Sequence, residues 1–251
     1  MSTQKDHPLV IIAAGKGTRI RAEGETLPKP LLEVMGMPLL KRTIMTAHDA
    51  GIRRFVVVLG YEAEQIQDAL SRDRQLRNLQ IKWIRHKLYD LSNGVSVLQA
   101  RPLIKGNFFL TMADHVIEPE LYTRLTNKPL RGDVALAVDY KLADVFDIQD
   151  ATKVKVSDDS RILQIDKQLS EYDAIDTGVF RCTPAIFDAL QAVLDETGDA
   201  SLSMGAKRLA DQNRAYVVDI GEHWWQDVDD LAMRTEAERR LSKSLPKSGP
   251  R

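Results

Sequence analysis

The segment that most restricts the fold of this chain lies near its start. Residues 9–13, LVIIA, form a continuous apolar run, which is typical of a buried parallel strand. The loop at residues 14–19, AGKGTR, follows directly. Its two glycines allow the backbone to approach a bulky anion closely, and successive N–H groups can point at that anion. A buried strand that ends in such a loop predicts an α/β fold with a phosphate-binding site.

Three basic residues, Lys16, Arg19 and Lys29, add positive charge to this stretch. Pro28 and Pro30 flank Lys29, and we expect them to hold it in an extended segment, because proline restricts both itself and the preceding residue. We predict that Lys29 and Arg19 act on the phosphates during catalysis. Arg19 could instead brace the loop, and Lys16 is expected to stay solvated until a ligand arrives. The predicted nucleotide-binding residues of this stretch are Ala13, Ala14, Gly15, Gly17 and Thr18.

Two common phosphate-binding motifs do not match this loop. The dinucleotide fingerprint G-x-G-x-x-G fails because Ile20 stands three residues after Gly17. The Walker A pattern fails because no Gly-Lys-Ser/Thr closes the loop. A dehydrogenase is therefore a poor interpretation of the sequence.

The order of the following elements predicts a mostly parallel sheet with helices on both faces. Strands are expected over residues 54–59, 79–85 and 108–112, and helices over residues 39–50, 62–72 and 93–103. Alternation of this kind is typical of parallel sheets, in which ligands bind beyond the carboxyl ends of the strands. The glycine loop, Asn93-Gly94 and Asp114 all fall at that edge.

The second half of the chain has more strands and shorter connections. Strands are expected over residues 133–140, 152–157, 162–165, 177–182 and 215–220, and helices over residues 184–195, 201–212 and 230–243. We find no low-complexity linker and no internal repeat. We therefore predict one domain over residues 1–243, with a nucleotide-binding half at 8–130, an acceptor-binding half at 131–230, and a flexible tail at 244–251.

Asp114 is the first predicted metal ligand, because it follows the apolar strand 108–112 directly. Mg²⁺ favours one or two carboxylates together with phosphate oxygens and water. The alternative is that Asp114 caps a helix at residues 118–126. Asp227 is preferred as the second ligand. Asp229 is its rival, although Asp229 is expected to cap the last helix instead.

The string A-A-G-x-G-T-R, followed nine residues later by P-K-P-L, resembles the signature of sugar-phosphate nucleotidyltransferases. The segment Trp225-Gln226-Asp227 also resembles a late Trp-x-Asp segment of that family. The resemblance implies a Rossmann-like mixed α/β fold of the nucleotide-diphospho-sugar transferase type, a Mg²⁺ cofactor and an NTP donor. More narrowly, the chain looks like the cytidylyltransferases that couple CTP to myo-inositol 1-phosphate. The stretches that carry this likeness are 93–98, 113–119, 152–156 and 174–180.

Other residues have both a functional and a structural interpretation. Asn93 and Gly94 form either a turn that reads the nucleotide base or simply the start of a helix. Lys167 holds the acceptor phosphate or is a solvated lysine after a strand. Asp176 is expected to accept hydrogen bonds from acceptor hydroxyls, and Gly178 to let the acceptor lie close.

The composition limits the partners and the location of the protein. The net charge is −1, so no basic surplus points to nucleic acid. A single cysteine, Cys182, excludes an internal disulfide and fits a reducing compartment. No apolar run approaches the ~20 residues that a membrane helix needs. We expect a cytoplasmic protein without membrane insertion, and leave a homodimer open.

Three functional interpretations stay open at this point. The first is an enzyme that makes a CDP-polyol and pyrophosphate from CTP and a phosphorylated polyol such as myo-inositol 1-phosphate. The second keeps this chemistry with phosphocholine, an aminophosphonate, or a hexose 1-phosphate and another NTP. The third is a non-catalytic nucleotide-sensing subunit, which two metal carboxylates argue against.

Overall fold

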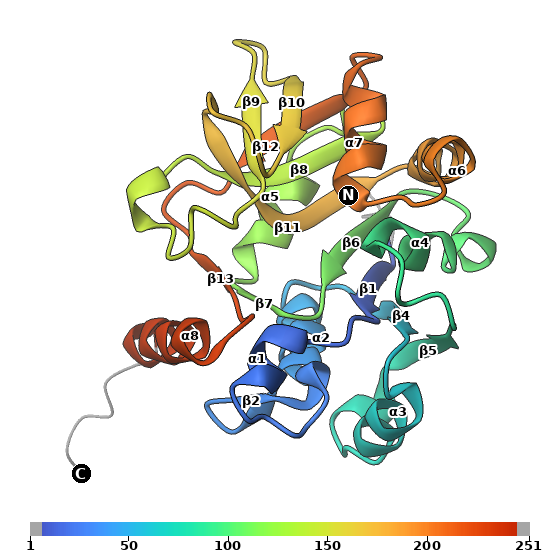
Figure 1. The fold of residues 1–251 in the computed structure, drawn as a ribbon, viewed down its shortest axis with the longest axis vertical. Coiled ribbons are helices and arrows are strands. Elements are labelled where there is room, and N and C mark those ends of the chain that lie inside the picture. The colour runs from blue at the N-terminus through green and yellow to red at the C-terminus, as the bar shows by residue number, and fades with distance from the viewer. Residues whose placement is uncertain (1–6, 245–251) are drawn as a thin grey trace, which may run out of the picture.

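The computed structural model describes residues 7–244, and its centre is a nine-stranded mixed sheet. Four strands from the first half of the chain run parallel to their neighbours in the order β6-β1-β4-β5 (Figure 1). Their bounds are β1 Leu9–Ala13, β4 Arg54–Leu59, β5 Gln80–Arg85 and β6 Phe108–Met112. Each of these apolar runs was predicted as a strand, and the parallel pairing confirms that prediction.

Five strands from the second half extend the sheet beyond β6. Strand β11 runs antiparallel to β6, β8 and β9, and β12 pairs with β8 in parallel. The bounds are β8 Val134–Asp139, β9 Lys153–Val156, β10 Ile162–Asp166, β11 Ala174–Cys182 and β12 Ala215–Asp219. The antiparallel strands make the sheet mixed, as predicted.

Helices cover both faces of the sheet because β1 is apolar on both sides. Leu9 and Ile11 pack in a core with helices α2, α3 and α5, whereas Val10 and Ile12 pack in a core with α4, α6 and α7. The bounds are α2 Leu39–Asp49, α3 Ala63–Ser71, α4 Asn93–Leu98, α5 Glu120–Asn127, α6 Ala185–Thr197 and α7 Leu202–Ala210. Burial on both faces explains why β1 contains no polar residue.

The segment around Lys29 differs from the prediction. Pro28 is extended, but Lys29–Leu31 forms a short 3-10 helix, η1. The carbonyls of Pro28 and Lys29 accept hydrogen bonds from the N–H groups of Leu31 and Leu32, at 2.8 and 3.0 Å. The expectation of an extended Lys29 was therefore wrong, because these turn hydrogen bonds outweigh the bias that a following proline imposes. The other short helices are η2 Leu76–Asn78, η3 Arg101–Leu103 and η4 Leu142–Asp144.

Several short elements connect the two ends of the chain and pack near a longer helix, which was predicted over residues 230–243. Helix α1 (Thr18–Ala22) follows the glycine loop, and β7 (His115–Ile117) pairs with β13 (Trp225–Asp227). A small hairpin joins β2 (Glu33–Val34) to β3 (Met37–Pro38). Helix α8 (Leu231–Ser244) lies near α1 and β2 in Figure 1. A third apolar cluster, which includes Ile20, Val34 and Ala237, joins these parts.

Two predictions concern the ends and the surroundings of the chain. Ser244 belongs to α8, and the rest of the predicted tail at 244–251 lies outside the described residues. Within residues 7–244, no helix combines the length and the apolar character needed to cross a bilayer.

Candidate active site

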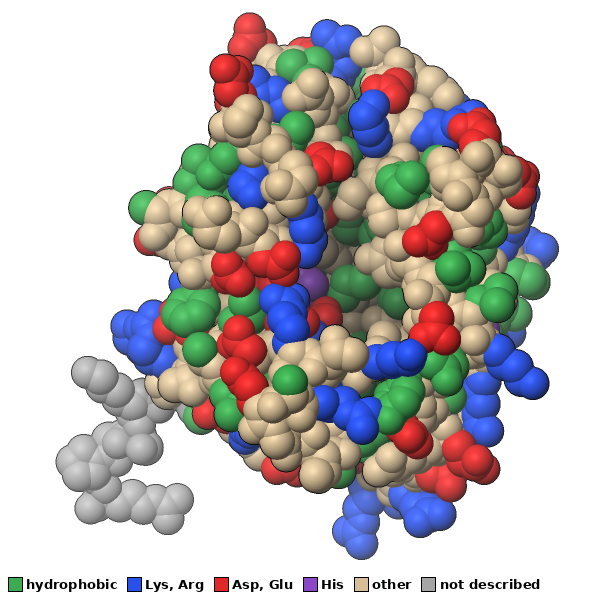
Figure 2. Space-filling model, viewed as in Figure 1, with side chains coloured by type: hydrophobic (Ala, Val, Ile, Leu, Met, Phe, Trp, Pro, Cys, Tyr) green, Lys and Arg blue, Asp and Glu red, His purple; other side chains and the backbone are tan. Residues whose placement is uncertain are grey.

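A cavity of about 440 Å³ opens at the carboxyl ends of β1 and β6. Figure 2 shows this hollow, with a histidine side chain inside it and charged side chains around it. The structure brings together every residue predicted for the site except Gly94. The predicted residues that line the cavity are Ala13, Ala14, Gly15, Gly17, Thr18, Arg19, Lys29, Asn93, Asp114, Lys167, Asp176, Gly178 and Asp227.

The shape of the glycine loop depends on close backbone contacts. Gly17 has a φ of +60°, and a Cβ atom there would lie 2.8 Å from the Cβ of Lys29. The N–H of Tyr61 donates to the carbonyl of Ala14 at 3.0 Å. At Gly60 a Cβ atom would lie only 2.7 Å from the same Ala14 oxygen. At position 17, glycine is needed for two reasons: its positive φ disfavours other residues, and the side chain of Lys29 leaves no room for a Cβ atom.

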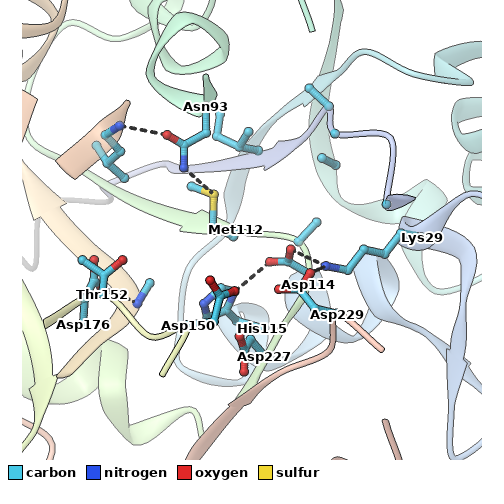
Figure 3. A pocket seen from close by; sticks show the side chains of 18 of the residues that line it. Lys29, Asn93, Met112, Asp114, His115, Asp150, Thr152, Asp176, Asp227 and Asp229 are labelled. Atoms are coloured by element: carbon cyan, nitrogen blue, oxygen red, sulfur yellow. Dashed lines mark hydrogen bonds and ion pairs between the residues drawn. The ribbon is translucent and has the colours of Figure 1, made fainter. Parts of the chain in front are cut away.

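Lys29 is the centre of the charged network. Lys29 is buried, with only 7% of its surface exposed. Its Nζ donates to Oδ2 of Asp114 at 2.7 Å and also to Oδ1 of Asp229 (Figure 3). Asp114 follows β6, Lys29 lies on η1 and Asp229 follows β13, so one ammonium group connects three distant parts of the chain. Lys29 thereby fixes the positions of two carboxylates.

The pairing of β7 with β13 brings the late acidic residues to this cavity. Asp227 lies opposite His115 in the ladder, and the N–H of Val228 donates to the carbonyl of Asp114 at 2.9 Å. The carboxylate of Asp227 accepts a hydrogen bond from the Gln226 side chain at 3.1 Å. Asp227 therefore lies in the predicted site, although Asp229 and not Asp227 contacts Lys29.

The expected cap of the last helix was wrong, and the alternative of a cap at Asp114 is excluded as well. Asp230, not Asp229, caps α8, because its Oδ1 accepts the N–H of Met233 at 2.7 Å. Asp229 is thus available to the cavity, where it pairs with Lys29 and Arg19. Helix α5 begins after Pro119, so the alternative of Asp114 as its cap is also excluded.

The carboxylates of this network differ in their proton affinities. Burial opposes ionisation of Asp114, but the charge of Lys29 and the hydrogen bond from His115 hold its pKa well below the usual range. Burial would lower the pKa of Lys29, yet Asp114 and Asp229 raise it above its ordinary value. Burial raises the pKa of Asp227. Asp114 is therefore anionic across the physiological range, as a ligand of a hard cation must be.

His115 is closer to the chemistry than its isolated position in the sequence indicated. Its Nδ1 lies 2.7 Å from Oδ1 of Asp114, and its ring stacks on Trp225 with centroids 6.0 Å apart. Gly178 has a φ of +73°, and a Cβ atom there would lie 2.7 Å from the ring of His115. Gly178 thus makes room for this histidine, which orients Asp114 from the side opposite Lys29.

Asp150 was not predicted, and it joins the two halves of the cavity. Its Oδ2 lies 3.0 Å from Nη1 of Arg19, and its Oδ1 lies 2.8 Å from Nζ of Lys167. Arg19 comes from the first half of the chain and Lys167 from the second. Asp150 lies in the connection between β8 and β9, where no repeat of apolar residues or motif distinguishes it. Only the topology could have revealed this carboxylate.

The Asn93-Gly94 turn has a clear structural role. Asn93 lines the cavity, and its Oδ1 accepts the N–H of Leu202 at 2.8 Å, which ties α4 to α7. Gly94 is buried outside the cavity, and a Cβ atom there would lie 2.5 Å from the carbonyl oxygen of Ala200. The structure therefore does not place Gly94 as a base-reading residue, because close helix packing explains this glycine.

The second half of the chain contributes a buried acid to the cavity. Asp176 accepts the N–H of Gly178 at 2.7 Å, and burial raises the pKa of Asp176 to about 6. Thr152 and Ser203 also line the cavity and supply hydroxyl groups. Neither was predicted, because single hydroxyl residues carry no signal in one sequence. Together with Asp176 they can bond a polyhydroxylated ligand.

Comparison with known proteins connects this geometry to a family. Residues 9–203 match the MobA-like NTP transferase domain. The chain is 32% identical over 238 residues to the "Bifunctional IPC transferase and DIPP synthase" of Aquifex aeolicus, and 34% identical over 240 residues to the protein of that name from Thermococcus kodakarensis. Each alignment covers 95% of this chain, but only 52% and 51% of those proteins. This chain thus spans about half the length of these relatives.

A solved structure extends the likeness to the fold. The inositol-1-phosphate CTP transferase from T. maritima superposes with a TM-score of 0.83 at 24% identity, over 96% of this chain and 98% of that one. Its fold confirms the nucleotide-diphospho-sugar transferase type predicted from the sequence. With its glycine loop, its buried lysine and its late acidic strand in one cavity, this chain belongs to the family of MobA-like NTP transferase domains.

Proposed function

We propose that this chain transfers CMP from CTP to myo-inositol 1-phosphate, giving CDP-inositol and pyrophosphate. The names of the curated relatives and of the T. maritima structure support this choice of substrates. The observation that carries the reaction class is the position of Lys29, buried between Asp114 and Asp229 beside the glycine loop. A site built from a close backbone, a fixed cation and two carboxylates suits the transfer of a charged phosphate group.

The proposed step is a displacement at the α-phosphorus of CTP. An oxygen of the acceptor phosphate forms the new bond, and the bond from the α-phosphorus to the bridging oxygen of the β-phosphate breaks. Pyrophosphate leaves with that electron pair. Arg19 and Lys29 stabilise the charge that develops on the donor phosphates, and Lys167 holds the acceptor phosphate. Little general-base help is needed, because a phosphate monoester is already ionised near neutral pH.

A divalent metal fits the donor set of this cavity. Asp114 and Asp229 lie around one cation, Lys29, and line the cavity with carboxylate oxygens. Hard cations such as Mg²⁺ favour such oxygens together with phosphate. We propose Asp114 and Asp229 as the metal pair, because both meet the same Nζ of Lys29. When bound, Mg²⁺ would supply further positive charge to the phosphate oxygens. Asp227 then lies beside the metal without binding it, and it affects the electrostatic field of the site.

This choice of ligands predicts different metal requirements for two variants. Asp229→Asn should raise the Mg²⁺ concentration needed for half-maximal pyrophosphate release by about tenfold or more, because the second metal ligand then loses its negative charge. Asp227→Asn is the matched control and should change this concentration less. A larger effect at position 227 than at 229 would reverse the assignment.

The lining of the cavity favours a polyol over a cationic acceptor. A choline-like head group would require an aromatic cage. Of Tyr172, Trp224 and Trp225, only Trp225 lines the cavity, and its ring is stacked against His115. Carboxylates and hydroxyls dominate the acceptor side instead, which suits the ring hydroxyls of inositol phosphate. The phosphocholine and aminophosphonate alternatives are therefore weaker.

The decisive test is pyrophosphate release with Mg²⁺ across four NTPs and four acceptors: inositol 1-phosphate, glucose 1-phosphate, phosphocholine and 2-aminoethylphosphonate. We expect release with CTP and inositol 1-phosphate alone. Release with a different pair would retain the reaction class and replace the substrates. Nucleotide binding without release from any pair would favour the nucleotide-sensing subunit. A cytoplasmic location and a homodimer stay predictions beside this proposal.

A further inference from the structure

A second cavity, of about 400 Å³, lies away from the candidate active site and shares no lining residue with it. It is formed by the end of α5 and the connection to β8, by strand β12, and by the hairpin tip between β9 and β10. Figure 1 shows α5, β8 and β12 together in the upper part of the molecule. The two cavities have similar volumes, so the second has room for a ligand of about the same size.

The lining of this cavity is strongly basic. Arg124, Lys128 and Arg131 contribute three positive charges, and Asp219 contributes the single carboxylate. An oxygen of Asp219 already accepts the N–H of Gly221 at 2.7 Å. The candidate active site differs, because five carboxylates line it beside three cations. In a chain whose net charge is −1, a cavity with this surplus attracts anions and repels metal ions.

Two of the three cations are held in place by groups that leave donors free. Nη1 of Arg131 donates to the carbonyl of Asp159 at 3.0 Å, and its guanidinium lies over the ring of Tyr216, 4.6 Å from the centroid. Nη2 of Arg131 reaches the Asp159 carboxylate only at 3.9 Å. Nη1 of Arg124 donates to the carbonyl of Asp219 at 3.2 Å. Each guanidinium has five N–H donors, so both retain capacity for a phosphate.

Lys128 and Ser160 complete the polar lining. Lys128 is exposed at the end of α5. Within residues 7–244, no carboxylate lies within ion-pair distance of its ammonium group. Ser160 adds a hydroxyl from the hairpin tip, and Tyr216 adds an aromatic wall. Positioned guanidiniums, an unpaired ammonium, a hydroxyl and an aromatic ring form a suitable environment for a phosphorylated organic molecule.

We propose that this cavity is a second ligand site, which takes a phosphate-bearing small molecule of nucleotide size. The three cations determine the class of ligand. Lys128 and Arg131 contact the phosphate, and Arg124 connects the bound phosphate to Asp219 at the end of β12. This site does not depend on the transferase reaction, because none of its residues lines the first cavity.

The second cavity is linked to the first through one short segment. Arg124 bonds the carbonyl of Asp219 and packs on Gly221, where a Cβ atom would lie 2.6 Å from Nη2 of Arg124. The chain then continues to β13, whose Trp225 and Asp227 line the candidate active site. A ligand that draws Arg124 toward itself acts on the segment that carries the late acidic residues. Occupancy of the second site would therefore be felt within one short segment of the late acidic residues.

The test counts binding sites by equilibrium dialysis with CTP, with pyrophosphate and with cytidine. Wild-type protein is expected to bind two equivalents of CTP or pyrophosphate per chain, and no second equivalent of cytidine, which lacks phosphate. In the double variant Lys128→Gln/Arg131→Gln, the second equivalent should bind about tenfold or more weakly, because each lost charged contact contributes to affinity. The first equivalent should be unchanged.

A matched control removes the same charge elsewhere. Arg74 and Lys105 are exposed residues that line neither cavity, so Arg74→Gln/Lys105→Gln should keep both equivalents. A second equivalent of only one phosphate probe would support the site and identify the moiety that it binds. Probe binding that the double variant retains in full, whether one or two equivalents, would overturn the proposal. These counts need no turnover, so they are independent of the outcome of the transferase test.

Discussion

The chemistry of single residues is clearest at Lys29. Its ammonium is buried between Asp114 and Asp229, so its loss removes the charge that both carboxylates and the donor phosphates need. We expect Lys29→Met, which retains much of the apolar stem, to lower kcat about 10²- to 10³-fold. Lys105→Met is the matched control, because Lys105 is exposed and lies outside the cavity.

Pyrophosphate release gives kcat for both variants, and circular dichroism checks that each is folded. Breaking a buried ion pair costs roughly 3–5 kcal/mol, so the fold must be verified before activity is compared. A Lys29→Met enzyme within tenfold of wild type would exclude the role proposed for this lysine.

Asp176 predicts a pH dependence of stability. Burial raises the pKa of Asp176 to about 6 in the folded protein, whereas an unfolded aspartate titrates near ~3.9. Between these values the folded state holds a proton that the unfolded state has lost, so this residue lowers stability as pH rises and has no further effect above pH ~6. Asp176→Asn removes the charge but keeps an acceptor for the N–H of Gly178.

The variant should therefore match wild type near pH ~4 and exceed it by roughly 1–3 kcal/mol above pH ~7. Urea unfolding of both proteins across this range measures the difference. Asp158→Asn, at an exposed hairpin position, serves as the control. A difference at Asp176 that stays constant with pH, or the same trend in the control, would contradict the assignment.

At the scale of elements, long apolar strands were predictable and short paired ones were not. Strands β1, β4 and β6 contain continuous apolar runs, and such a run alone predicts a strand that is buried on both faces. Strands β7 and β13 have three residues each, and their pairing joins residues more than 100 positions apart. No local pattern could reveal that pairing, and it decides the positions of Asp227 and Asp229. The sequence therefore indicated that Asp114 lies at this edge of the sheet, but it did not identify which late acid contacts Lys29.

The loop between β1 and α1 gives a prediction that separates backbone strain from steric contact. Gly17→Ala introduces a Cβ at a φ of +60° and places it 2.8 Å from the Cβ of Lys29. Gly36→Ala has the same kind of strain, with a φ of +69°, but no atom within 4 Å. Both should lose about 1–2 kcal/mol of stability, measured by urea unfolding. Only Gly17→Ala should also lower kcat, by about tenfold or more, because it displaces Lys29. Equal activity of the two variants would show that the contact with Lys29 is unimportant.

At the scale of the whole molecule, the cavity joins two halves that the sequence distinguished only by the spacing of their elements. The glycine loop and Asp114 come from the first half, whereas Lys167 and Asp176 come from the second. Motifs identified the first group, because phosphate binding restricts the backbone strongly. The second half contributes single side chains from separate segments, and this explains why Asp150, Thr152 and Ser203 were missed.

Asp150 connects these halves, because its two oxygens meet Arg19 at 3.0 Å and Lys167 at 2.8 Å. These cations are also the ones proposed to hold the donor and acceptor phosphates, so the carboxylate competes with both substrates. We expect Asp150→Asn to lower the KM for CTP and for the acceptor two- to fivefold, a modest effect because exposed ion pairs contribute about 0.2–1 kcal/mol. Steady-state kinetics with each substrate varied in turn measures this change. Asp158→Asn, which removes an exposed carboxylate outside the cavity, should leave both constants unchanged. A rise in either KM would instead mean that Asp150 binds a substrate directly, as an acceptor of its hydroxyl groups, and that the link between the halves is secondary.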